Sequence, residues 1–395
     1  MASTIEKAFP LRLLNAPPEE RVNYFFEYKT FHPRLREVDK YLWRAIHTRL
    51  EDTIIFVFGP TGVGKTTLTE GIKRALVKEA RRKLSATENR QRAPFLCVEA
   101  PSPEGGRFDW RDFYRRSFAE LERPFIEQIG ADPKSTITPR LANAVGYNPR
   151  LPYSDFRFGV EQALRLRQPA TFMIDDAQHI GKMGSGRRTQ DQLDVIKSLI
   201  RRSNTLITLI GTYELMSLRN LSGQLSRRSI DIHFPRYGNS PEDLKEFQNV
   251  LWTFQKRLPL LVEPNLMKNW EYCYVYSVGC VGILKDWLTR ALEDAVAQNA
   301  STITPDILER NALTVDKCET IATEALDGEA RMSRQRGAST RLLQMLGFTK
   351  INRPVQKSVE EPAREVPKYE FSVTNPRLPS LPSRRKTRHP SDSEP

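Results

Sequence analysis

One eight-residue segment constrains the fold of this chain more than any other feature. Residues 59–66 read Gly-Pro-Thr-Gly-Val-Gly-Lys-Thr and match the pattern G-x-x-x-x-G-K-[ST] in full. A continuous apolar run at 53–58 precedes this segment, and we expect a helix to begin near Lys65. The order strand, loop, helix is typical of a loop that wraps around a phosphate group, because glycines let the backbone approach the anion closely.

The residue types of this loop predict separate roles at a nucleotide. We expect Lys65 to reach the β- and γ-phosphates of ATP and the Thr66 hydroxyl to ligate Mg²⁺. The residues expected to contact the nucleotide here are Gly59, Pro60, Thr61, Gly62, Val63, Gly64, Lys65, Thr66 and Thr67. ATP and Mg²⁺ are therefore the predicted cofactors.

Further short apolar runs predict the sheet that carries this loop. They lie at 93–98, 171–174, 205–210 and, more weakly, 230–234. Helical patterns separate most of these runs, and strands that alternate with helices are typical of an α/β fold with a parallel sheet.

The pattern changes along the chain and predicts five segments. They are a helical extension (1–50), an α/β core (51–238), a small all-helical lid (239–325), a second helical extension (326–349) and a basic, proline-rich tail expected to be disordered (350–395). Within the lid, Thr304 and Pro305 predict the start of a helix, since they suit its cap and its first turn.

Charge and composition narrow the class of partner. The chain has 61 Lys and Arg against 48 Asp and Glu, so its net charge of +13 favours a polyanion such as nucleic acid; a basic surface that binds nothing is the alternative. No apolar run approaches the roughly 20 residues of a membrane helix, and residues 1–20 lack a signal-peptide pattern. The 4 cysteines fit neither a disulfide scaffold nor a zinc pattern. We therefore expect a cytoplasmic protein with no membrane partner.

Polar residues at the ends of two expected strands are the catalytic candidates. Asp175 and Asp176 follow the run 171–174; Asp175 is expected to hold Mg²⁺, and Asp176 to polarise the attacking water. Thr212 follows the run 205–210, where a hydroxyl is expected to orient water near the γ-phosphate. The alternative for Thr212 is a cap of the next helix.

Two basic sites complete the candidate list. Arg227 or Arg228, just before the last expected strand, is predicted to act across a subunit boundary as an arginine finger, unless this is a solvated basic turn. Lys285 begins a lid helix and is expected to reach back to the nucleotide; the alternative is an exposed helical lysine.

Taken together, these segments resemble AAA+ ATPases and, among them, the TnsC/TniB/MuB family of transposition regulators. The resemblance covers about residues 25–325 and neighbours the IstB-type and ExeA-type ATPases. It rests on FHPRLREVDKYLWRAI (31–46), GPTGVGKT (59–66), FMIDDAQHI (172–180), LIGTYEL (209–215), QLSRR (224–228) and GCVGILKDWLTRAL (279–292). It implies an AAA+ P-loop domain with a helical lid.

The resemblance also implies a function. Such proteins bind ATP between adjacent subunits, assemble on double-stranded target DNA as rings or helical filaments, and recruit a transposase that stimulates hydrolysis. A nucleoid-associated bacterial location follows, and a target-selector protein or CRISPR-associated adaptor is a further candidate partner. The chain departs from the pattern at Asp176, where glutamate is usual, and at Lys285, where many members carry arginine. The shorter Asp176 predicts slow hydrolysis.

In the AAA+ layout, loops after the second and third strands face a central channel. The predicted phosphate contacts to DNA are therefore Arg107, Lys182, Arg187 and Arg188. Few aromatic residues lie among them, so we expect contacts to the duplex backbone and not stacking on single strands. Two other readings stay open: a secretion or assembly ATPase that does not act on DNA, and a non-hydrolysing scaffold gated by ATP.

Overall fold

The computed structural model describes residues 8–48, 53–83, 92–103, 106, 108–122, 153–182, 186–220, 228–337 and 345–347. The chain divides into two units, Met1–Gly337 and Ala338–Pro395, and the second is described at 345–347 alone. The tail expected at 350–395 therefore lies outside the described residues. So do two candidate site residues, Arg107 and Arg227.

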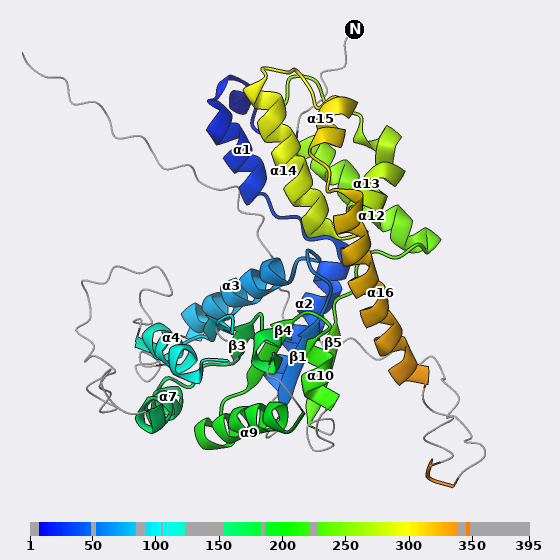
Figure 1. Ribbon diagram of the computed structural model, residues 1–395. Helices are drawn as coiled ribbons and strands as arrows, with labels where there is room; N and C mark the ends of the chain where they lie inside the picture. Colours follow the sequence, from blue (N-terminus) through cyan, green and yellow to red (C-terminus); the bar gives the residue numbers. More distant parts are fainter. Residues whose placement is uncertain are drawn as a thin grey trace, which may run out of the picture. The chain divides into compact units, whose positions relative to one another are not determined.

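A five-stranded parallel sheet forms the centre of the first unit (Figure 1). Its strands are β1 (Ile54–Phe58), β2 (Leu96–Glu99), β3 (Phe172–Asp175), β4 (Ile207–Gly211) and β5 (Ser229–His233). The spatial order is β2-β3-β4-β1-β5, so β1 lies inside the sheet and the loop after it is held at the carboxyl ends of the strands. The α/β fold with a parallel sheet, predicted from the apolar runs, is confirmed.

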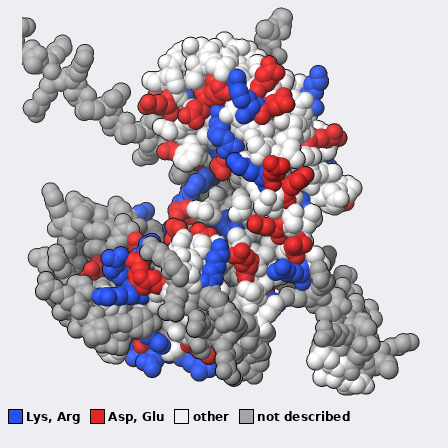
Figure 2. Space-filling model, in the orientation of Figure 1, with Lys and Arg blue, Asp and Glu red and all other residues white. Residues whose placement is uncertain are grey.

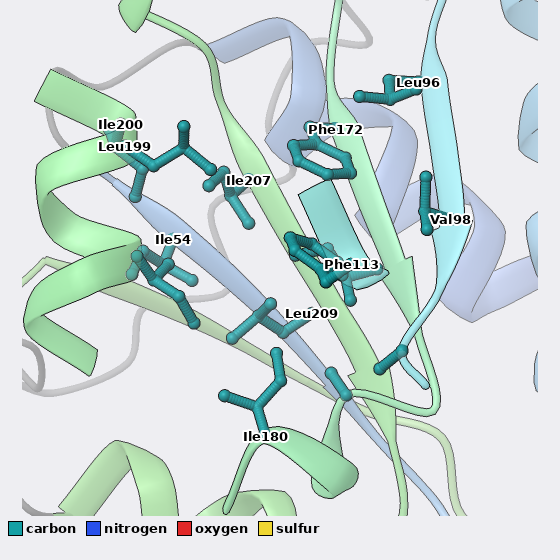
Figure 3. Packing of buried hydrophobic residues seen from close by; sticks show 14 of the residues in the cluster. Ile54, Leu96, Val98, Phe113, Phe172, Ile180, Leu199, Ile200, Ile207 and Leu209 are labelled. Atoms are coloured by element: carbon teal, nitrogen blue, oxygen red, sulfur yellow. The ribbon is translucent and has the colours of Figure 1, made fainter. Parts of the chain in front are cut away.

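The side chains of β1 alternate between two cores. Ile54, Phe56 and Phe58 pack in the cluster on one face of the sheet, part of which Figure 3 shows, and Ile55 and Val57 pack on the other. All five are buried, which explains why the sequence reads as a continuous apolar run and not as an alternation.

Helices cover both faces of the sheet. One face packs against α2 (Pro33–Thr48) and α3 (Lys65–Lys83). Helices with buried side chains in the cluster on the other face are α4 (Trp110–Glu122), α7 (Tyr153–Arg167), α8 (Gln178–Gly181), α9 (Gly186–Ser203) and α10 (Leu215–Asn220). This layered arrangement is the AAA+ P-loop fold.

A helical lid with its own core follows the sheet. Its elements are α12 (Pro241–Arg257), η4 (Leu266–Asn269), α13 (Trp270–Tyr276), α14 (Val281–Ala297) and α15 (Pro305–Arg310). The predicted start at Thr304 is confirmed, because its side chain accepts a hydrogen bond from the Ile307 N–H at 3.3 Å and Pro305 is the first helical residue.

The N-terminal segment contains η1 (Leu11–Asn15) and α1 (Pro18–Glu27) before α2. It does not form a body of its own: Phe25 of α1 is buried in the lid core, whereas α2 belongs to the core of the sheet. Residues 25–35 therefore connect the lid core with the core of the sheet.

The last described helix of the first unit is α16 (Val315–Gly337), and the boundary expected after residue 325 falls within it. It returns from the lid to the sheet, where Met332 is part of the core cluster. A Cβ at Gly328 would lie 2.0 Å from the ring of Tyr213, so the helix approaches the residue after Thr212 closely. Among the described helices, none is long and apolar enough to cross a membrane.

Candidate functional site

The loop between β1 and α3 has the backbone conformation that its glycines predict. Gly62 and Gly64 have φ angles of +71° and +112°, which L-residues with side chains rarely adopt. Helix α3 begins at Lys65, so its first N–H groups have no partner within the helix. The Lys65 ammonium donates hydrogen bonds to the carbonyl oxygens of Gly59 (3.1 Å) and Pro60 (2.9 Å), and the loop thus wraps around it.

The lid docks directly on this loop. The Gly282 N–H, in the first turn of α14, donates to the Gly62 carbonyl at 2.7 Å. Both contact positions require glycine: a Cβ at Gly282 would lie 2.5 Å from the Gly62 oxygen, and one at Gly62 would lie 2.4 Å from Ile283. The start of α14 and the phosphate loop are therefore held together at backbone distance.

A cavity of about 730 Å³ opens where loop, lid and N-terminal segment meet. Its size lies within the range of roughly 300–1,000 Å³ that is typical of ligand sites. The residues that line it from the phosphate loop and the end of β3 are Thr61, Gly62, Val63, Gly64, Lys65, Thr66, Thr67, Asp175 and Asp176. The structure thus places seven of the nine expected loop contacts at one cavity together with Asp175 and Asp176, whereas Gly59 and Pro60 do not line it.

Burial perturbs the charged groups of this cavity. It lowers the pKa of Lys65, while the nearby Asp175 and Asp176 act in the opposite direction. It raises the pKa of Asp175; the hydrogen bond from the Asp176 backbone N–H and the charge of Lys65 oppose this shift, whereas the negative charges of Asp176 and Glu99 add to it. A further negative charge beside Lys65, such as a phosphate, would favour its charged form.

The donor set fits Mg²⁺. Thr66 and Asp175 line the same cavity and supply one hydroxyl and one carboxylate, and Mg²⁺ commonly takes one or two carboxylates and completes its shell with phosphate oxygens and water. Within the described residues, no group of three His, Cys, Asp or Glu side chains could hold a metal ion, so no competing all-protein cage is present there.

The turn after β3 contains the expected base. Asp176 has a φ of +49°, and its N–H donates to the Asp175 carboxylate at 3.0 Å. Its own Oδ1 accepts a hydrogen bond from Gln178 at 3.0 Å. Gln178 also accepts from the Thr212 backbone N–H at 3.2 Å, a contact between two segments that sequence reasoning did not foresee.

Thr212 is placed beside the cavity and not on its lining. Its Oγ1 is buried and has no hydrogen-bond partner among the described residues, and Thr212 precedes the start of α10 at Leu215. Arg228 directly precedes β5 and does not line the cavity either, and its predicted role would be toward a neighbouring subunit.

Lys285 lines the cavity, but its ammonium contacts the N-terminal segment. It lies 3.7 Å from the centre of the Phe25 ring and donates to the Phe25 carbonyl oxygen. Burial lowers its pKa to about 7; Lys29 adds to this shift and Asp286 opposes it. In this structure, the basic residue of the lid helix is thus held by α1.

The N-terminal segment supplies a wall that the sequence did not predict. The residues that line the cavity from it are Phe26, Glu27, Tyr28, Lys29, Thr30, His32 and Leu35. His32 is neutral, because burial lowers its pKa to about 4, and its Nδ1 lies 3.0 Å from the Tyr237 hydroxyl. The sequence predicted only a helical extension here, and the resemblance at 31–46 names no partner within the chain.

The described DNA-contact candidates lie just after β3. Lys182 is exposed and its ammonium lies 3.6 Å from the Glu214 carboxylate. Arg187 and Arg188 are in the first turn of α9, and their side chains are outside the described set. Figure 2 shows Lys and Arg interspersed with Asp and Glu over the described part of one face. Whether Arg187 and Arg188 contact DNA stays a prediction.

Comparison with known proteins identifies the domain. Residues 48–218 match a family described as "AAA domain", so the chain contains an AAA-type ATPase domain. Among curated proteins, none matches the chain.

Solved structures similar to this chain include several origin-recognition proteins. The Aeropyrum pernix ORC2 protein in its ADP form is 16% identical, with a TM-score of 0.46 over 73% of this chain and 71% of that one. The Aeropyrum pernix ORC1 protein in complex with DNA is 16% identical, with a TM-score of 0.47 over 72% and 65%. A Walker-type ATPase of Pyrococcus abyssi is 14% identical, with a TM-score of 0.44 over 82% of each chain.

Proposed function

We propose that this protein is an ATP-dependent regulator of DNA transposition. It binds double-stranded DNA largely without sequence preference, oligomerises on it as a ring or filament, and recruits or activates a transposase. The observation that carries the ATP-dependent part of the proposal is the shared cavity, in which the lid residue Gly282 docks on the phosphate-loop residue Gly62. A nucleotide in this cavity touches core and lid at once, so its presence biases their arrangement and the surfaces offered to neighbours.

The residues divide the chemistry of hydrolysis among them. Lys65 neutralises phosphate charge, and Thr66 and Asp175 would hold Mg²⁺, which offsets charge on the phosphate oxygens. Asp176 orients and polarises the water, with Oδ2 available because Oδ1 is bonded to Gln178. Thr212, and Arg227 or Arg228 from a neighbouring subunit, would complete the site. The short Asp176 supports slow turnover that a partner stimulates.

The DNA part of the proposal rests on charge and on the motif resemblance. The net charge of +13 favours a polyanion, and Lys182, Arg187 and Arg188 follow β3, where the AAA+ layout has a channel loop. Loop arginines and lysines reach phosphates more often than base edges, so we expect little sequence preference. Transposase is the proposed protein partner, with a target selector or CRISPR-associated adaptor as a further one.

The experiment measures ATP turnover and assembly on plasmid DNA, with and without transposase, for the full chain and for Lys65→Ala. We expect the wild type to form ATP-dependent assemblies and Lys65→Ala to form none, because the variant loses the charge that faces the phosphates. Lys78→Ala is the matched control, since Lys78 is exposed on the same helix and does not line the cavity.

Three outcomes contradict parts of the proposal. Assembly of Lys65→Ala with unchanged nucleotide dependence would remove the cavity from the mechanism. ATP turnover and assembly that are the same with and without DNA would favour a secretion or assembly ATPase. If the protein needs ATP to bind DNA but does not hydrolyse ATP, even with transposase, the result would favour a non-hydrolysing scaffold.

The predicted DNA contact of Arg187 is tested separately, because α9 has arginines near both of its ends. Arg187→Glu should weaken binding equally across sequences and reduce the slope of log affinity against log salt by about one. Arg201→Glu, in the last turn of the same helix, is the control with the same change of charge. An equal effect of both variants would show that only net charge matters and would remove Arg187 from the interface.

A further inference from the structure

Gln178 connects two catalytic segments that are 34 residues apart in the chain. It is the first residue of α8, directly after the turn that contains Asp176, and only 8% of it is exposed. Its Oε1 accepts from the Thr212 backbone N–H at 3.2 Å, and its Nε2 donates to Asp176 Oδ1 at 3.0 Å. Since one neighbour donates and the other accepts, only this orientation of the amide satisfies both.

The backbone around Gln178 leaves room for this amide and holds the two segments together. The Ala177 N–H donates to the Ile210 carbonyl at 3.0 Å, which fastens the turn after β3 to the end of β4. A Cβ at Gly211 would lie 2.3 Å from Gln178 Oε1, a distance that real Cβ atoms do not show. A Cβ at position 211 would therefore displace this amide, so glycine at 211 leaves room for the Gln178 side chain at the ends of the neighbouring strands β3 and β4.

The amide connects a residue on the cavity with one beside it. Asp176 lines the cavity, whereas Thr212 does not and keeps a buried Oγ1 without a partner among the described residues. We propose that Gln178 is a positioning residue, which holds the Asp176 carboxylate and the Thr212 loop as one unit during hydrolysis. The inference rests on the ATP hydrolysis of the proposed function and on no statement about DNA or transposase.

The bonds assign two tasks to the side chain. By donating to Oδ1, Gln178 fixes the rotation of the Asp176 carboxylate, so that Oδ2 faces a constant direction. By accepting from the Thr212 N–H, it fixes the position of the backbone at Thr212, directly after β4. A glutamine that merely fills space would perform neither task, and its loss would affect stability and nucleotide binding as much as turnover.

Two substitutions test these tasks. Gln178→Met keeps the length of the side chain and loses both hydrogen bonds. Gln178→Glu keeps the acceptor for Thr212 but loses the donor to Asp176 and adds a like charge beside it. The readouts are kcat for ATP without DNA, Kd for a fluorescent ATP analogue, and the thermal midpoint of the full chain.

We expect kcat to fall by about 10- to 100-fold in both variants, as for other residues that orient a reacting group, while Kd changes less than threefold. Gln298→Met is the control, because Gln298 also donates an amide hydrogen bond to an aspartate, Asp294, but does so on the surface at the far end of α14. Unchanged kcat overturns the inference. So does a Kd that rises in proportion to the loss of kcat, since that pattern indicates a structural role.

Gly211→Ala provides a second, independent test. In the wild type, the added Cβ should displace the Gln178 amide and reduce kcat about as much as Gln178→Met does. In a Gln178→Ala background the space is free, so Gly211→Ala should change kcat less than threefold. Losses that multiply in the double variant overturn the inference.

Failure of the inference and failure of the proposed function give different results. Turnover that DNA and transposase leave unchanged contradicts the proposed function, while the ratio of variant to wild-type kcat without DNA still decides the role of Gln178. A wild type with no turnover under any condition overturns the positioning role along with hydrolysis.

Discussion

The docking of the lid on the phosphate loop can be tested with a single methyl group. In Gly282→Ala, the new Cβ would lie 2.5 Å from the Gly62 carbonyl oxygen and 3.1 Å from its carbon. Both atoms belong to the backbone, so no side chain can rotate away. Ordinary contact begins at 3.4 Å, and the start of α14 must therefore withdraw by about 0.9 Å.

The geometry sets the size of the effect. A shift of about 0.9 Å takes the hydrogen bond of 2.7 Å from Gly282 to Gly62 beyond the usual limit of about 3.2 Å. The lost bond costs about 1 kcal/mol, and leaving its half-buried groups unpaired costs up to about 1 more, whereas the better helix propensity of alanine offsets part of this at the start of the helix. A net loss of about 1.5–2 kcal/mol corresponds to roughly a 10- to 30-fold rise in Kd for a nucleotide that needs the docked lid.

The assay is titration of a fluorescent ATP analogue together with thermal unfolding. Gly71→Ala in α3 is the matched control: it makes the same chemical change in a helix, but its Cβ meets Asp39 at an ordinary 3.5 Å. We expect the control to bind normally and to be equally or more stable. If Gly282→Ala also binds normally, α14 does not need contact at backbone distance with the loop, and the reasoning is wrong.

The remaining predictions concern charge, packing and the base. Burial lowers the pKa of Lys285 from 10.5 to about 7, so the unfolded chain binds more protons between these values and stability rises with pH there. Lys285→Met should flatten this rise by up to about 1.4 kcal/mol per pH unit in urea unfolding, and parallel curves would contradict it. Gly328→Ala should destabilise the fold by about 1–3 kcal/mol through its clash with Tyr213, despite a better helix propensity, while the exposed Asp327→Ala should not; equal unfolding midpoints would contradict the packing. Asp176→Asn should leave nucleotide affinity intact and slow turnover further, with longer-lived assemblies on DNA seen by electron microscopy; unchanged turnover would remove Asp176 as the base.

The strands were predictable because their signals are local. The ends of each predicted apolar run differ by at most three residues from the ends of the observed strand. The run at 93–98 begins early because residues 93–95 precede Leu96, the first residue of β2 that pairs with β3. The phosphate loop was equally predictable, since Gly62 and Gly64 adopt the positive φ angles that its pattern requires. Local backbone preferences and burial on both faces therefore decide these elements.

The partners of amphipathic helices were not predictable in the same way. An apolar stripe shows that a helix is buried and leaves the opposing surface unnamed. Hence the sequence suggested an N-terminal extension as one segment, whereas Phe25 packs in the lid core and Leu42 in the core of the sheet. The same limit hid the contact of Lys285 with Phe25, because 260 residues separate them.

The catalytic centre lies between these two cases, because it is specified by the register of two strands. In parallel pairing, Ile174 is opposite Leu209, so the turn at Asp175 and Asp176 reaches the end of β4 just where Gly211 and Thr212 begin the next loop. Neither segment alone reveals that Gln178 would meet Gly211. Once the register is known, the Gln178 amide explains the glycine at 211, because a Cβ there would lie 2.3 Å from Gln178 Oε1. The pair Gln178 and Gly211 is therefore the sequence feature that links Asp176, the expected base, to Thr212, the residue expected to orient water.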